Sequence, residues 1–212
     1  MNLKKIIKPI LIGLAIVMGT AITIIIGFVV IVGSSFGLFD KKYNTTELVE
    51  NFNNNKQQIY IARQYFNSII PKYKKINIEF DGKKISRLEI YPIDTGRGSD
   101  LTTNFLDWNL SQKKTDSVIA TIGWNEEILD TLRRKLKDAD CISISNGDPT
   151  EIGFKRSGMG MYFFLVFDKP IPDSSKSKLN DSCMFIYANK NLVLKYEGGA
   201  FGNQCFPNKR SK

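Results

Sequence analysis

The side chains that could do chemistry in this chain are carboxylates and cysteines, because its 212 residues include no histidine. Without an imidazole, a Ser-His-Asp or Cys-His arrangement has no proton carrier, and zinc has no histidine ligand. Carboxylates remain as general acids and bases. Asp94, Asp100 and Asp107 lie in a polar stretch, residues 94–116, where a site could form. A hydrolase that uses two of these carboxylates is therefore one alternative to a protein that only binds.

The three cysteines, Cys141, Cys183 and Cys205, are separated by 41 and 21 residues. Metal-binding and redox motifs need closer spacing, so this pattern predicts neither kind of site. In an oxidising compartment it predicts one disulfide and one free thiol. We favour Cys183 with Cys205, since this bond would tie a Gly-rich C-terminal segment to a strand. Cys141, which lies among apolar residues, is expected to be a buried thiol.

Glycine-rich stretches indicate neither a nucleophile elbow nor a nucleotide site. Residues 33–37 match G-x-S-x-G, but they follow an apolar segment, and the chain has no histidine to activate the serine. Neither residues 158–160 nor residues 198–202 join a strand to a following helix with the spacing of a phosphate loop. The sequence therefore predicts no catalytic motif, no cofactor and no metal.

An apolar segment near the N-terminus predicts a transmembrane helix over residues 9–32. No charged residue lies between Lys8 and Asp40. As a helix, residues 10–32 would extend roughly 35 Å, enough to cross the hydrocarbon core of a bilayer with some tilt. A cleaved signal peptide is the alternative, but its apolar region would be shorter. The lipid bilayer is thus the first expected partner.

Flanking lysines set the expected orientation. Lys4, Lys5 and Lys8 precede the apolar segment and Lys41 and Lys42 follow it, a bias that favours a cytoplasmic N-terminus. The chain then divides into a cytoplasmic basic segment (1–8), a signal-anchor helix (9–32), a connector (33–43), an extracytoplasmic domain (44–206) and a basic tail (207–212).

Small residues recur at every fourth position of the anchor, at Ala15, Gly19, Thr23 and Gly27. This spacing places them on one helix face, where a second transmembrane helix could approach closely. Chance is the alternative explanation, because Gly, Ala and Thr are common in helices that cross lipid. The four residues are a candidate packing face.

The net charge of +9 is concentrated near the chain ends. Residues 1–42 hold five lysines and one aspartate, and the last four residues hold three more cations. In the sequence between these two segments, charges of both signs are interspersed. It has no basic stripe with interleaved aromatic residues, the pattern that nucleic-acid binding requires. Nucleic acid is therefore not an expected partner.

Helices are expected early in the outer domain and strands late. Apolar residues at helical spacing predict helices over 47–70, after a capping-box-like start at Asn44, and over 125–137, with Asn125 as N-cap. Alternating or β-branched runs predict strands over 76–80, 85–93, 117–122, 141–145, 151–155, 161–167, 182–188 and 192–197. This order predicts an α+β fold: one domain with a mostly antiparallel sheet and two helices packed on one face.

The class of protein that follows is a single-pass, membrane-anchored protein of the bacterial envelope. Its extracytoplasmic domain is expected to bind a protein partner or another ligand without catalysis. The alternatives are the carboxylate-dependent hydrolase and a structural subunit of a membrane assembly, which only the small-residue face supports.

Overall fold

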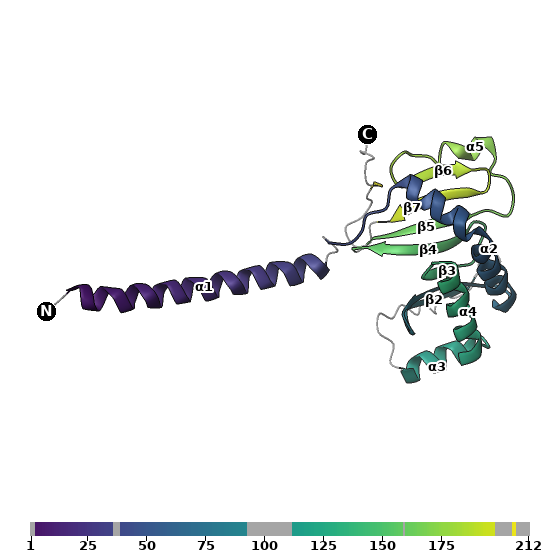
Figure 1. The fold of residues 1–212 in the computed structure, drawn as a ribbon. Helices are drawn as coiled ribbons and strands as arrows, with labels where there is room; N and C mark the ends of the chain where they lie inside the picture. Colours follow the sequence, from purple (N-terminus) through teal and green to yellow (C-terminus); the bar gives the residue numbers. More distant parts are fainter. Residues whose placement is uncertain (1–2, 36–38, 93–111, 159, 198–204, 207–212) are drawn as a thin grey trace. The chain divides into compact units, whose positions relative to one another are not determined.

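The computed structural model describes residues 3–35, 39–92, 112–158, 160–197 and 205–206. The chain divides into two compact units (Figure 1). The N-terminal unit holds helix α1 (Leu3–Ser35), and the second unit, from Lys42, holds the sheet and the other helices. Each unit is described by itself below.

Helix α1 is a single apolar helix of 33 residues. Residues Ile16–Ser34 are long and apolar enough to cross a membrane, and they are the one such stretch among the described residues. Side chains along this stretch are exposed; Ile24, for example, is 71% exposed. The hydroxyl group of Thr23 donates to the carbonyl oxygen of Gly19 at 2.9 Å, so it is satisfied within the helix.

The second unit has an α+β fold built on a seven-stranded antiparallel sheet, as the alternating runs predicted. The strand order is β2-β1-β3-β4-β5-β7-β6 (Figure 1). The strands are β1 (Lys74–Asp81), β2 (Lys84–Pro92), β3 (Ser143–Ser145), β4 (Thr150–Ser157), β5 (Gly160–Val166), β6 (Phe185–Asn189) and β7 (Leu192–Glu197).

Strands β1 and β2 form a hairpin because the sequence between them supplies a turn. Gly82 has φ of 58°, a left-handed conformation that glycine adopts without a steric penalty. Ile78 pairs with Leu88 across the hairpin, and both are fully buried. The hairpin therefore has one apolar face, which needs a cover.

Helices α2 (Thr45–Ile69) and α4 (Glu126–Asp138) supply that cover. Asn44 and Glu47 close a capping box at the start of α2, and Asn125 caps α4 by accepting from the backbone N–H of Ile128 at 2.9 Å. Both helices therefore begin at the capping residues that the sequence predicted. The buried faces of α2 and α4 join the sheet in one apolar core.

Residues 117–122 are not a strand, contrary to the expectation. They belong mainly to helix α3 (Gln112–Thr121). Val118, Ile119 and Ile122 are buried in the core that α2 and α4 share, since residues one turn apart lie on one helix face. The β-branched composition suggested a strand, and tertiary packing overrode that propensity. Among the described residues, three helices rather than two cover this face.

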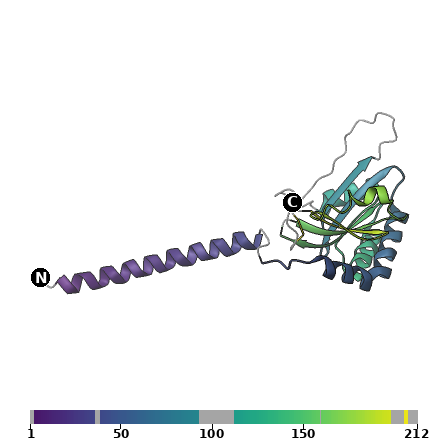
Figure 2. The same ribbon diagram turned by 90° about the horizontal axis from the view of Figure 1, so that it is seen from above.

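On the opposite face of the sheet, the apolar cluster found among the described residues lies over β5, β7 and β6. There Leu165, Val193 and Ile171 form a separate small cluster next to α5 (Asp173–Lys176), a short helix that the sequence did not predict. Figure 2 shows α5 on the other side of the sheet from α2. Over β1 and β4 this face carries charged side chains, including Glu79 and Arg156.

Candidate functional site

A groove of about 660 Å³ lies where the C-terminal half of α4 meets the β1–β2 turn and strand β4. Apolar residues at its base include Phe80, Leu136 and Ile142. Seven charged residues line it: Lys83, Asp130, Arg133, Arg134, Lys137, Asp140 and Lys155. We call this feature the basic groove, because five of these seven residues are cationic.

Helix α4 supplies one wall of the basic groove. Asp130, Arg133, Arg134 and Lys137 follow one another at helical spacing, which places them along one side of the helix while Leu132 and Leu136 enter the core. Arg133 joins this wall to the β1–β2 turn.

The guanidinium of Arg133 makes two contacts. Its Nη1 donates to the carbonyl oxygen of Lys83 at 3.2 Å, and its Nη2 lies 2.8 Å from Asp130 Oδ1. The first contact crosses from α4 to the turn between β1 and β2, so the two elements that form this end of the groove are linked directly. Asp130 is satisfied by the same guanidinium.

The other end of the groove is built around Asp140, which follows α4 with φ of 54°. Lys155 Nζ lies 2.5 Å from Asp140 Oδ1, and Asn51 Nδ2 donates to Asp140 Oδ2 at 3.3 Å. Asp140 thus joins β4, α2 and the end of α4. Both carboxylates of the groove are therefore already paired with a cation.

Cys141 lies beside Asp140 and is 5% exposed. Its thiol donates to the carbonyl oxygen of Ala139 at 3.3 Å. Burial raises the pKa of the Cys141 thiol strongly, and the negative charge of Asp140 adds to this effect while Lys155 opposes it. The group is therefore a protonated thiol at neutral pH, which makes it a poor nucleophile and a poor metal ligand.

Lys83, Arg134 and Lys137 differ from the other two cations of the groove. Within the described ranges, no carboxylate lies within ion-pair distance of any of the three. All three are exposed. The groove therefore presents a positive charge that the chain itself does not neutralise in the part that the structure describes.

A second set of charges lies on the polar face of the sheet. Arg156 contacts Glu79 through two parallel bonds, Nε to Oε1 at 2.6 Å and Nη2 to Oε2 at 2.5 Å. The side chain of Glu79 is only 5% exposed. Because each partner satisfies the other in a bidentate pair, this cluster fixes β4 against β1 and offers no free charge.

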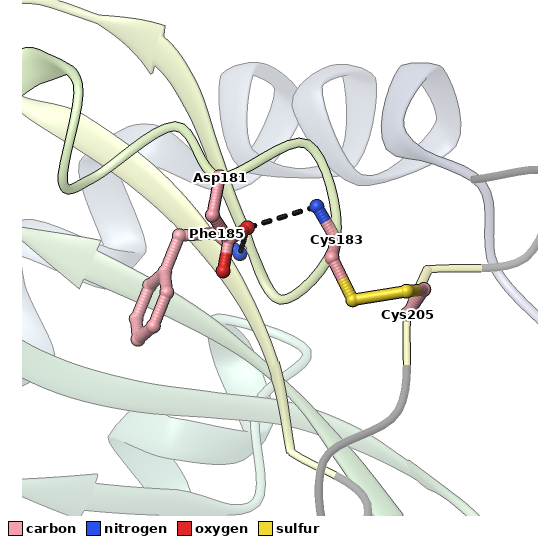
Figure 3. The surroundings of a disulfide bond; sticks show 4 residues. All are labelled: Asp181, Cys183, Phe185 and Cys205. Atoms are coloured by element: carbon pink, nitrogen blue, oxygen red, sulfur yellow. Dashed lines mark hydrogen bonds between the residues drawn. A yellow bond between two sulfur atoms is a disulfide. The ribbon is translucent and has the colours of Figure 1, made fainter. Parts of the chain in front are cut away.

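The disulfide pair that the sequence favoured, Cys183 and Cys205, lies at bonding distance, with the sulfur atoms 2.11 Å apart. Figure 3 shows Asp181 beside it. Asp181 Oδ1 accepts from the backbone N–H groups of Cys183 and Phe185, both at 2.8 Å (Figure 3). The loop before β6 is thereby held in the conformation that presents Cys183 to Cys205.

Of the other residues singled out from the sequence, none that the structure describes lines the groove. Asp94, Asp100 and Asp107 lie outside the described residues. Ala15, Gly19, Thr23 and Gly27 belong to α1, and Gly19, Thr23 and Gly27 are exposed there. In the described part of the chain, no group of three or more His, Cys, Asp or Glu residues gathers to hold a metal ion.

Sequence reasoning missed the basic groove because its residues come from three distant segments. The spacing of Arg133, Arg134 and Lys137 on the predicted helix was the one local signal. Comparisons with protein families, with characterised proteins and with solved structures give no match for this chain.

Proposed function

We propose that this chain is a single-pass membrane protein with a cytoplasmic N-terminus, and that its disulfide-bonded domain binds a ligand or partner outside the cytoplasm without covalent chemistry. The exposed apolar surface of α1 carries the proposal. Burying such side chains in lipid is favourable by about 25 cal/mol for each Å² of apolar surface removed from water.

Support for the orientation comes from two independent features. The lysines at positions 4, 5 and 8 favour retention of the N-terminus in the cytoplasm. The disulfide between Cys183 and Cys205 is a bond that persists in oxidising compartments. Both features support a location of the second unit outside the cytoplasm.

Support for binding rather than catalysis comes from the basic groove. Five cations line it, and burial keeps its thiol protonated. Such a lining can hold an anion, and a protonated thiol is a poor nucleophile.

A cysteine-accessibility experiment tests the topology. In a Cys141→Ala background that retains the disulfide, Lys190→Cys places a thiol in the exposed β6–β7 turn, and Lys5→Cys places one before the anchor. In intact cells, a membrane-impermeant maleimide should label the first variant, and it should label the second only after lysis.

The reverse labelling pattern would contradict the proposed orientation. Recovery of the chain in the soluble fraction, with a new N-terminus near residue 34, would show instead that α1 is a cleaved signal sequence.

A further inference from the structure

We infer that the basic groove binds a phosphate-bearing ligand. This inference rests on the binding role proposed above and specifies the chemistry of what is bound. A phosphate group has three acceptor oxygens and carries close to two negative charges, so it is matched by several cations around one opening.

The size of the groove suits a small ligand or one headgroup of a larger one. Its volume of about 660 Å³ is within the range of small-molecule sites, which runs from about 300 to 1,000 Å³. Its lining combines apolar side chains with charged ones, and seven of the twelve lining residues are charged.

The balance of charged side chains in the groove indicates that its ligand carries a negative charge. Asp130 is satisfied by Arg133, and Asp140 is satisfied by Lys155. Lys83, Arg134 and Lys137 then remain without a carboxylate in the portion of the chain that is described. An anion that enters the groove therefore meets three cations and displaces no existing ion pair.

The positions of these cations are partly fixed before a ligand arrives. Lys83 comes from the β1–β2 turn, and Arg134 and Lys137 come from α4. The bond from Arg133 Nη1 to the Lys83 carbonyl oxygen ties the turn to the helix. Holding the two elements together lowers the entropy cost of gathering their cations around one anion.

Lysines favour phosphate over a single carboxylate in this setting. Two of these three cations are lysines, whose ammonium groups act as point charges and bind phosphate well. A carboxylate pairs best with the planar guanidinium of arginine, and lysine lacks that planar geometry. A dianion also gains from all three cations, whereas a monovalent carboxylate does not.

Calorimetric titration of inorganic pyrophosphate into the full chain, held in nanodiscs of neutral phosphatidylcholine, tests the inference. We expect saturable binding for the wild-type chain. The double variant Lys83→Gln/Lys137→Gln should weaken that binding about tenfold or more, because it removes two of the three cations available to the anion.

Lys72→Gln/Lys178→Gln is the matched control, because it removes two exposed lysines that lie outside the groove. It should bind pyrophosphate as the wild-type chain does. Thermal melts of both double variants check that the fold is retained, which we expect since the substituted lysines are exposed.

A second arm identifies the source of the phosphate. Repeating the titration in nanodiscs that contain phosphatidic acid, whose headgroup is a phosphomonoester, should abolish the pyrophosphate signal if the groove takes a lipid headgroup, and should leave it unchanged if the ligand is soluble. Both outcomes support phosphate recognition.

Failure to bind pyrophosphate in neutral nanodiscs, or equal weakening by the control variant, would overturn the inference. If the labelling experiment has meanwhile placed the domain outside, the proposed topology still stands and only the ligand chemistry is wrong.

Discussion

On one face of the sheet, Ile76, Ile78, Tyr162 and Phe164 pack beneath α2, α3 and α4, whereas the other face joins β1 to β4 through Glu79 and Arg156. Burial of apolar area under the helices stabilises any arrangement in which the side chains fit. It is non-directional, so it specifies the alignment of the strands only weakly. A bidentate ion pair adds little net energy after desolvation, yet it tolerates only one register. The comparison indicates that the helical face supplies most of the stability and that the polar face helps to define strand alignment.

The largest expected change in stability comes from neighbouring residues of β5 that point to opposite faces of the sheet. Phe164 is fully buried against Phe52 and Phe154 beneath the helices, whereas Leu165 belongs to the small cluster on the other face. Phe164→Ala should cost about 4 kcal/mol and Leu165→Ala about 2 to 3 kcal/mol, as expected for a cavity in a large and in a small core. Chemical denaturation of the full chain in detergent micelles, followed by tryptophan fluorescence, measures both.

An equal or larger loss for Leu165→Ala would contradict the assignment of the main core to the helical face.

The polar face is tested by a double-mutant cycle on Glu79→Gln and Arg156→Gln. Breaking a fully buried pair costs about 3 to 5 kcal/mol, and because the Arg156 side chain is about a third exposed we expect a coupling energy of about 2 kcal/mol. The helix pair Asp130–Arg133, in which the Asp130 side chain is 59% exposed, is the comparison, with an expected coupling below about 0.5 kcal/mol.

A coupling energy for Glu79 and Arg156 no larger than that of the surface pair would mean that the polar face does not contribute to strand alignment.

The smallest expected effect is a pH dependence that arises on the helical face. Burial raises the pKa of the Cys141 thiol, so the folded state holds the proton more tightly than the unfolded chain does. This contribution to stability is fully present below the thiol pKa of the unfolded chain, about 8.5, and is lost as pH rises above it. The free energy of unfolding should fall by about 1 kcal/mol between about pH 8.5 and 9.5.

Urea denaturation at several pH values measures this slope, and Cys141→Ala is the control that should abolish it. Burial also raises the pKa of Tyr196, but from a starting value of 10.0, above this window. A slope that persists in Cys141→Ala would assign the pH dependence to another group.

Local signals predicted the elements whose boundaries depend on neighbouring residues. The capping residues Asn44 and Asn125 begin α2 and α4, and the run at Leu192–Glu197 is strand β7. The helical state of residues 117–121 could not be predicted, because it depends on Val118 and Ile119 finding the core beneath them. The basic groove was hidden for the same reason, since Lys83, Arg134 and Lys155 become neighbours only when the hairpin, α4 and β4 have come together.

Tyr162 of β5 contacts both ends of the described part of the second unit. Its ring lies 5.6 Å from that of Tyr43 and 5.9 Å from that of Phe206, and its hydroxyl group accepts from the backbone N–H of Tyr43 at 3.2 Å. Domains whose boundaries lie close together tolerate circular permutation and insertion into a host loop. A short linker between the segments that contain Tyr43 and Phe206 should therefore give a circularly permuted domain, with its new termini at the Asn189–Asn191 turn. The same closeness should allow the sheet and its helices to be inserted as one domain into a loop of a host protein.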